Sequence, residues 1–207
     1  MRNLKFAFII IFITAICVAH LPGEVGIKAG LNISKLSSIT GDEMFSYKSR
    51  IGFQFGAFYT ISLTQSLSVQ PELYFIKKGG KVNLESDNLS FAYIMNYVEI
   101  PVLLRYKFPS QGSIYPLVLM GPYCAFKTSA RIKDIDSGES VDITDNTKFI
   151  EFGFSGGLGA EYYLSESADL LFELRYNLGL SKVFKGAEGL NAFGKNNSLI
   201  FMVGASF

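Results

Sequence analysis

The sequence predicts an all-β protein, a closed antiparallel barrel of eight transmembrane strands of the outer-membrane type. The 207 residues are 49% hydrophobic and 18% charged, and the mean hydropathy is +0.27. No apolar run reaches the ~20 residues that a membrane helix needs. From Glu24 onward, apolar residues recur at every second position, which is the period of a strand. Short and long connections alternate between these segments, as they do in outer-membrane barrels.

The composition excludes several other classes of protein. Aromatic residues make up 14% of the chain, which together with the low charge argues against disorder. Two Cys are too few for a disulfide or zinc scaffold. The 19 basic and 18 acidic residues give a net charge of +1, so we expect no nucleic-acid partner.

The N-terminal segment has the pattern of a secretory signal peptide, residues 1–19. Arg2 and Lys5 form a basic start, an apolar stretch follows, and Ala19 ends a run suited to cleavage. A membrane anchor is the alternative, and the short apolar stretch argues against it. The barrel domain is therefore predicted to span residues 20–207. Its single Cys, Cys124, excludes an internal disulfide, so the fold must be held by its own hydrogen bonds.

Eight segments alternate between apolar and polar residues. The seventh, 168–180, is the clearest, because every even-numbered residue from Leu170 to Leu180 is apolar. The fifth alternates least well, because Leu117 and Leu119 fall on the polar face. The segments are 24–33, 50–63, 67–78, 91–108, 113–127, 149–163, 168–180 and 198–207.

The connections between the segments predict the topology. Short turns at 63–66, 109–112 and 164–167 keep the apolar positions in register on both sides, as paired strands require. Longer stretches lie at 34–49, 80–90, 128–148 and 181–197. We therefore expect short periplasmic turns and four long extracellular loops.

The polar face of the strands carries nearly balanced charge, which predicts that it points into the barrel. An eight-stranded barrel is just wide enough for side chains to fill it, and buried charges need partners. The apolar face would then meet lipid, whereas a soluble lipocalin-like carrier would bury that face. The expected interior charge network is Lys28, Glu72, Glu99, Arg105, Glu161, Asp169, Glu173 and Arg175.

Two features are predicted to act at the membrane. Phe207 ends the last alternating segment on its apolar face, and we interpret it as a membrane-insertion signal read by the barrel assembly machinery. Lys77, Lys78 and Lys81 lie where the third segment leaves the membrane, and they are expected to contact lipopolysaccharide phosphates. Lysines that only extend to the membrane surface are the alternative.

Four prolines fall within predicted strands: Pro71, Pro101, Pro116 and Pro122. Every strand of a closed barrel is central, and Pro lacks the amide hydrogen that pairing needs. We therefore hypothesise a weak or bulged seam through the third to fifth strands. Harmless bulges near strand ends are the alternative.

Six segments of the mature chain carry recognisable motifs: 25–32 (VGIKAGLN), 70–74 (QPELY), 77–79 (KKG), 96–106 (NYVEIPVLLRY), 121–123 (GPY) and 174–180 (LRYNLGL). Together they resemble the PorT-type family of outer-membrane β-barrel proteins, and the resemblance covers nearly all of the mature chain. The resemblance implies an outer-membrane barrel and a link to protein secretion of the type IX kind.

The chain has little that suggests catalysis. Barrel enzymes of this membrane generally use His as a base, and the one His, His20, precedes the first strand at the turn side. Five acidic residues gather between Asp134 and Asp145, but Gly138 falls at the fifth position of that run and not at the sixth, where an EF-hand needs it. We expect no enzyme activity, no cofactor and no metal.

The sequence therefore predicts a non-enzymatic component of the cell outer membrane. Its expected partners are outer-membrane lipid and lipopolysaccharide, the assembly machinery, and a protein of a secretion complex. A transporter or pore for small solutes or lipid ligands is an alternative, which a filled interior argues against because porins need about 16 strands. A lipid-modifying enzyme is a further alternative, which the single His argues against.

Overall fold

The computed structural model describes residues 23–38, 45–84, 89–184 and 193–207. Within them, η1 (Thr144–Asn146) is the one helical turn, and no helix is long and apolar enough to cross a membrane. The predicted signal peptide and His20 lie outside the described residues. The strands are β1 (Gly23–Ser38), β2 (Phe45–Ser62), β3 (Leu67–Leu84), β4 (Leu89–Lys107), β5 (Ile114–Asp134), β6 (Ser140–Asp142), β7 (Ile150–Ser165), β8 (Ala168–Gly179) and β9 (Phe193–Ser206).

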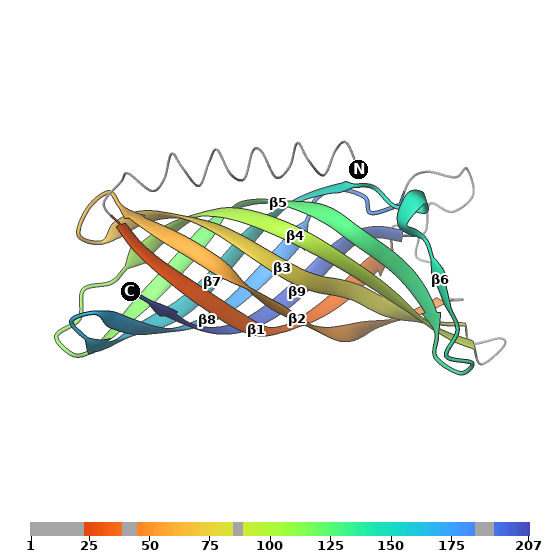
Figure 1. Ribbon diagram of the computed structural model, residues 1–207, viewed down its shortest axis with the longest axis horizontal. Coiled ribbons are helices and arrows are strands. Elements are labelled where there is room, and N and C mark those ends of the chain that lie inside the picture. The colour runs from red at the N-terminus through yellow and green to blue at the C-terminus, as the bar shows by residue number, and fades with distance from the viewer. Residues whose placement is uncertain (1–22, 39–44, 85–88, 185–192) are drawn as a thin grey trace.

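Eight of these strands form a closed antiparallel barrel (Figure 1). The neighbours run β4-β3-β2-β1-β9-β8-β7-β5, and pairing of β4 with β5 closes the ring. The first and last strands meet at β1 and β9, where Val25 and Phe207 exchange two backbone hydrogen bonds of 3.3 and 2.8 Å. β6 is a short extra strand paired only with β5. The predicted fold class is confirmed.

The two ends of the barrel differ, and we name them the turn end and the loop end. Short turns at 63–66, 108–113 and 166–167 join the strands at the turn end, close to the predicted positions. At the loop end the strands are longer than the alternation predicts, since β3 reaches Leu84 and β4 begins at Leu89. Strand pairing continues there beyond the alternating apolar residues, because the hydrogen bonds between strands join backbone groups and do not require apolar side chains. The loops predicted at 34–49 and 80–90 are therefore mostly strand.

The alternation places apolar residues on the outer wall. On β1, Ile27 and Leu31 are 61% and 58% exposed, whereas Lys28 between them is 3% exposed. The same pattern holds on β8, where Phe172 points outward and Glu173 inward. A continuous exposed apolar wall needs lipid to cover it. Lipid offers no hydrogen bonds to backbone N–H and C=O groups, and the closed ring of strands supplies those hydrogen bonds instead. The polar face points inward, as predicted.

Pairing is interrupted beside Pro71, Pro101 and Pro122 without a shift of register, whereas Pro116 lies in an unbroken β5–β7 ladder. The β3–β4 ladder skips from the Pro71–Val102 pair to the Tyr74–Glu99 pair, and both pairs belong to one register. The β4–β5 register instead shifts between Asn96 and Tyr97. The missing pairs agree with the weak seam of the hypothesis, and the register shift of the β4–β5 ladder lies away from the prolines. A Pro removes one donor but keeps the extended backbone, so the chain need not gain a residue.

The interior also contains apolar layers that the predicted network lacks. Leu117 and Leu119, the two misfits of the fifth segment, point inward and are each 1% exposed. They pack with Phe58, Leu103 and Leu171. A larger apolar cluster, which includes Tyr74, Ile76, Met95, Tyr97 and Ile200, lies deeper toward the loop end.

Candidate functional site

The barrel interior holds three clusters of ion pairs, and the central one joins four predicted residues. Lys28 Nζ lies 3.1 Å from Glu72 Oε1 and 2.6 Å from Glu173 Oε1. The Arg175 guanidinium contacts both oxygens of Glu72, at 2.5 and 2.7 Å, and Glu173 at 2.5 Å. Each of the four is at most 5% exposed. Two cations thus neutralise two carboxylates, which is the condition under which buried charge is tolerated.

A second cluster lies near the turn end. Glu161 accepts hydrogen bonds from Arg105 and from Lys107, the latter at 3.0 Å. Asp169, which was expected to join the network, is half-buried, and its Oδ1 has no hydrogen-bond partner among the described residues. Seven of the eight predicted interior residues are therefore held by ion pairs, but in three separate groups and not in one network.

The third cluster lies toward the loop end and is centred on Lys78. Its Nζ lies 2.5 Å from Glu99 Oε2 and 3.1 Å from Glu151 Oε1. The Tyr123 hydroxyl donates to Glu151 at 3.2 Å, and Asn177 donates to Glu99 at 2.8 Å. Lys78 also faces the Tyr123 ring, 4.6 Å from its centroid. One ammonium group therefore holds two carboxylates together.

This geometry corrects the prediction that Lys78 contacts lipopolysaccharide. The Lys78 side chain is 0% exposed and points into the barrel, because it continues the inward parity of Glu72, Tyr74 and Ile76. Lys77 has the opposite parity, and its Nζ lies 5.6 Å from the centroid of the Phe53 ring on the outer wall. The two-residue period in the sequence already contained this distinction.

The predicted third loop folds over the loop end of the barrel. β6 extends β5 by pairing at residues 131–133, and η1 follows it. Lys127 Nζ donates to the carbonyl oxygens of Thr144 at 2.5 Å and Thr147 at 2.8 Å. Ile143 and Phe184 pack on the apolar cluster beneath. The third loop, through Ile143, and the connection after β8, through Phe184, thus cover the apolar layer at the mouth of the barrel.

The acidic residues of that loop stabilise its turns. Asp134 Oδ1 accepts hydrogen bonds from the amides of Asp136 at 2.9 Å and Ser137 at 3.2 Å. Asp142 Oδ1 accepts one from the Thr144 amide at 2.8 Å. The amide of Ser137 above all, and that of Asp136, lower the pKa of Asp134; that of Thr144 lowers the pKa of Asp142. Among the described residues, no group of three or more His, Cys, Asp or Glu could hold a metal.

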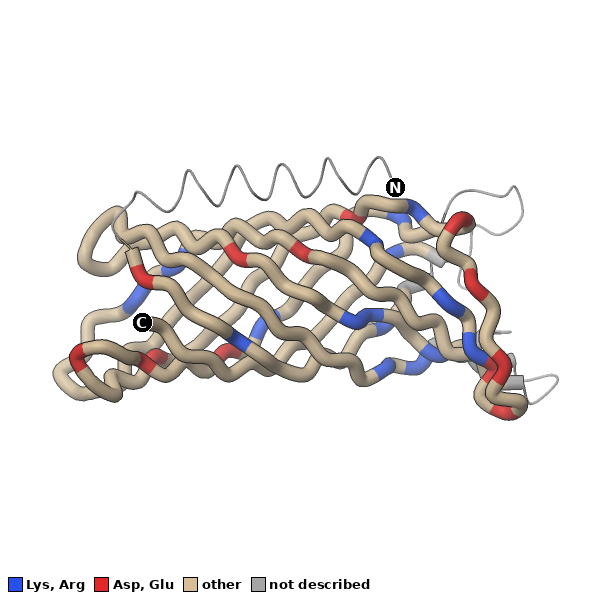
Figure 2. The backbone as a smooth tube through the Cα atoms, in the orientation of Figure 1, with Lys and Arg blue, Asp and Glu red and all other residues tan. Residues whose placement is uncertain are grey.

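Charged residues are frequent along the backbone at the loop end (Figure 2). Lys81, Arg131 and Lys133 are exposed there, on β3 and β5. Lys81 and Lys77 thus remain on the side that the lipopolysaccharide prediction requires, whereas Lys78 does not. Phe207 lies at the opposite end, 62% exposed on the apolar wall.

Solved barrels of other outer membranes share this fold. A major outer membrane protein from Thermus thermophilus matches with a TM-score of 0.55 at 12% identity, covering 89% of this chain and 99% of that one. Neisserial surface protein A matches with a TM-score of 0.50 at 16% identity, covering 88% and 95%. OprG from Pseudomonas aeruginosa matches with a TM-score of 0.49 at 15% identity, covering 90% and 96%. At these identities, the likeness to the first two shows the fold alone.

The sequence also matches one family over most of its length. No curated protein sequence matches the chain. A family model described as an outer membrane protein beta-barrel domain matches residues 21–185. With the closed ring and the lipid-facing wall described above, the chain belongs to the outer membrane protein beta-barrel domain family and lies in the cell outer membrane.

Proposed function

We propose that this protein is a non-enzymatic interaction component of the cell envelope, which contacts a protein partner through its extracellular loops. The observation that carries the proposal is the filled interior. Three ion-pair clusters and two apolar clusters occupy the barrel, and Ile143 and Phe184 cover the upper apolar layer. Each of the five interior glutamates that form ion pairs has a Lys or Arg partner: Glu72, Glu99, Glu151, Glu161 and Glu173. What remains accessible to a partner is the loop end.

The hairpin formed by β6 and the end of β5 is the most exposed described part of that end. Ile135 and Val141 are 43% and 64% exposed. Among the described residues β6 pairs on one side only, so its other edge offers backbone groups for a further strand. Exposed apolar residues next to an open strand edge are typical of a surface that another protein covers. Glu139 and Asp142 beside them would favour a basic partner surface.

The resemblance to the PorT-type family supports a partner in a protein-secretion complex of the type IX kind. A barrel that fills its own interior would serve such a complex as a membrane anchor or a docking subunit, and not as its conduit. We expect loss of this protein to reduce the secreted proteins of the cell while leaving its lipid A structure unchanged.

Photo-crosslinking in intact cells tests the proposed surface. A photoreactive residue at Val141 or Ile135 is expected to give one discrete crosslinked protein, identifiable by mass spectrometry. The same residue at Leu164, an exposed position at the turn end, is the matched control and is expected to give a different product or none. Identical products at both ends, or none at the hairpin, would contradict the proposal.

We also propose that Lys77 and Lys81 contact lipopolysaccharide phosphates. Both lie on β3 on the outer wall toward the loop end, where the anionic headgroups of the outer leaflet begin. The double variant Lys77→Gln/Lys81→Gln is expected to bind lipopolysaccharide in detergent more weakly than the wild type.

A further inference from the structure

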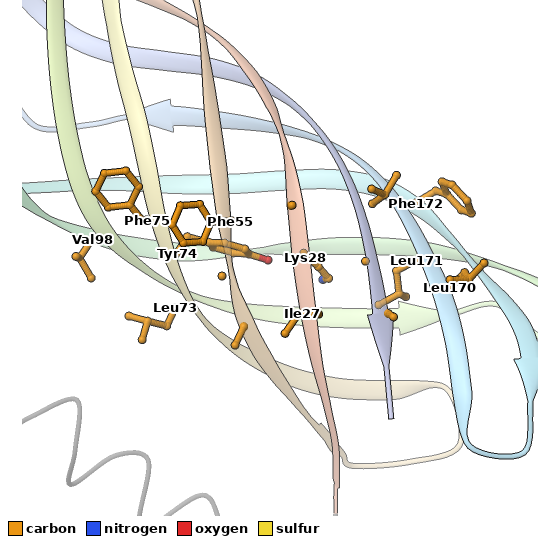
Figure 3. Close-up of a pocket in the computed structure, with 16 residues that line it drawn as sticks. Ile27, Lys28, Phe55, Leu73, Tyr74, Phe75, Val98, Leu170, Leu171 and Phe172 are labelled. Atoms are coloured by element: carbon orange, nitrogen blue, oxygen red, sulfur yellow. The ribbon is translucent and has the colours of Figure 1, made fainter.

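β6 is the one described strand that has an open edge. The eight strands of the barrel wall each pair on both sides. Figure 3 shows part of that wall, where Phe55 on β2 lies beside Phe75 on β3. β6 instead pairs with β5 alone, at residues 131–133. Its second edge therefore carries backbone groups that no other described strand uses.

One backbone hydrogen bond shows which residues of β6 face the open edge. The Ile143 amide donates to the Ala130 carbonyl across the hairpin at 2.9 Å, so Ile143 turns its backbone groups toward β5. In an antiparallel pair, such residues alternate with residues whose backbone groups point away from the partner strand. Counting back from Ile143, Asp142 and Ser140 therefore turn their N–H and C=O groups toward the open edge. These groups have the alternating order that an added strand needs for pairing.

The open edge lies outside the membrane. Ile132, the partner of Val141, lies 18 residues after the start of β5, which begins near the turn end. Each residue of a tilted barrel strand rises roughly 2.5 Å along the barrel axis, so Val141 lies about 45 Å above the turn end. The apolar band of such barrels is about 25 Å tall. Figure 1 shows β6 at the end of the molecule away from the turns. The edge is therefore well beyond the band, where another protein can reach it.

The edge lacks the features that keep other edge strands from pairing. Natural edge strands are blocked by Lys, by Pro or by a bulge, whereas the three residues of β6 are Ser140, Val141 and Asp142. Val favours the strand conformation, and the Val141 side chain is 64% exposed. An added strand would cover this side chain and bond the backbone groups on either side of it.

The charges around the edge indicate the sequence of the segment that would pair there. Residues 134–142 contain four carboxylates and no Lys or Arg. Glu139 lies two residues before Val141, so both side chains are on one face of the hairpin. Asp142 is on the other face, where Arg131 lies opposite it on β5. The added strand would therefore place a basic residue beside Glu139 and, two positions away, an apolar residue beside Val141.

We propose that the open edge of β6 binds an extended segment of a partner protein as an added strand, with a basic residue and an apolar residue two positions apart. Hydrogen bonds to the backbone of Ser140 and Asp142 hold the segment, and contacts to Glu139 and Val141 select its sequence. The proposal deepens the interaction surface proposed above and rests on that proposed function for the presence of a partner in the cell.

Amide hydrogen exchange of the purified full-length barrel in lipid nanodiscs, measured by NMR, tests the edge. In the free protein, the Ser140 and Asp142 amides are expected to exchange fast, and the Val141 amide, which faces β5, is expected to exchange slowly. The probe is a synthetic peptide in which Thr alternates with Lys and Val in turn. At saturation this peptide is expected to slow exchange at Ser140 and Asp142 about tenfold and to leave Val141 unchanged.

Variants of the edge separate strand pairing from simple attraction of charge. Ser140→Pro removes one donor of the open edge while the Val141 bonds to β5 remain, and it is expected to weaken peptide binding about fivefold. Ser140→Thr keeps the amide and is the matched control with wild-type affinity. Glu139→Lys is expected to weaken this peptide about fivefold and to strengthen binding of a peptide with Glu in place of Lys. A peptide with N-methyl groups on alternate residues cannot pair along one edge and is expected not to bind.

The outcomes separate the edge from the proposed cellular partner. Slow exchange at Ser140 and Asp142 in the free protein would show that this chain or a second copy already covers the edge, and would overturn the proposal. Equal binding of the N-methylated peptide, or by Ser140→Pro, would overturn strand addition. Photo-crosslinking that persists unchanged in Ser140→Pro would do the same and leave the proposed interaction surface intact. Peptide pairing at the edge with no crosslinked protein in cells would support the edge and overturn the proposed function. Slow exchange of the Val141 amide confirms in each variant that the hairpin is intact.

Discussion

Adjacent residues of this barrel can have opposite surroundings and therefore opposite roles. Lys77 and Lys78 are neighbours in sequence, yet one lies on the lipid-facing wall and the other is fully buried between two carboxylates. Burying a charge costs free energy, so the contribution of Lys78 to stability depends on the carboxylates that it contacts. Removing one partner of such a group costs more than removing all of them.

Lys78→Met is expected to lower the free energy of unfolding by about 3–5 kcal/mol, because Glu99 and Glu151 would be left buried without a cation. Urea unfolding of the barrel in lipid vesicles measures this. Lys77→Met is the control and is expected to change stability little. The triple variant Lys78→Met/Glu99→Gln/Glu151→Gln is expected to recover most of the loss. A Lys78→Met barrel as stable as the wild type would show that the cluster carries no such cost.

Phe207→Ala is expected to slow barrel assembly in cells while leaving the folded barrel stable. The variant keeps the two backbone hydrogen bonds with Val25 and loses only the exposed ring. The fraction of protein with a heat-dependent gel shift, followed after a pulse of synthesis, reports assembly, and refolding of the purified protein is the control. Equal assembly rates would count against Phe207 as an insertion signal.

At the scale of an element, the β5–β6 hairpin and η1 are attached to the barrel by few contacts. Lys127 extends from β5 to carbonyl oxygens at both ends of η1, and Ile143 packs on the apolar cluster. The turns within the loop depend on carboxylates that cap backbone amides. Such a segment can loosen while the barrel stays intact.

Lys127→Met is expected to speed amide hydrogen exchange in residues 143–147 without changing exchange in the barrel strands. The ammonium contacts to Thr144 and Thr147 would be lost, while the methylene stem is kept. Lys148→Met, an exposed lysine of the same loop, is the control. Unchanged exchange in η1 would show that apolar packing alone holds the loop.

Acid is expected to weaken the turn that Asp134 stabilises in the same loop. Because the folded pKa of Asp134 lies below its ordinary value of 3.8, the carboxylate stabilises the turn above that pH. This contribution is lost as the pH falls through the lowered pKa. An NMR titration should therefore show the Asp136 and Ser137 amide signals moving with a midpoint below 3.8. The variant Asp134→Asn should remove this transition, and a midpoint above 3.8 would contradict the assignment.

At the scale of the whole molecule, the filled interior predicts a barrel that conducts no ions. Apolar residues such as Leu117 and Leu119 pack between the charged clusters. Eight strands leave just enough room for side chains. The interior is thus a packed core, although many of its side chains are charged or polar, as in a channel.

Planar bilayer recordings of the purified barrel are expected to show no stepwise currents at any applied voltage. The physical reason is that ion flow would need the buried clusters of Lys28 and Lys78 to separate. The inserted protein is verified by its heat-dependent gel shift before recording. Reproducible conductance steps would overturn the filled interior and favour a pore.

The strands, the turn end and the wall that faces lipid can all be predicted from the amino-acid pattern. These follow from the two-residue period, which is a local property of the chain. It also placed seven interior charges correctly, because parity assigns a face to every residue of a strand. The same parity assigns Lys78 to the interior, and the prediction of a lipopolysaccharide contact failed there because it rested on rim position instead. Strand ends beyond the apolar band had no such signal and were predicted as loops.

Which interior residues contact one another depends on the three-dimensional fold. Lys28 on β1 contacts Glu173 on β8, although β9 lies between these two strands. Lys78 on β3 contacts Glu151 on β7, which is not a neighbouring strand either. These contacts depend on the stagger of strands around the closed barrel, which no local pattern encodes. Parity gives each residue a face, and closure of the barrel gives it its neighbours.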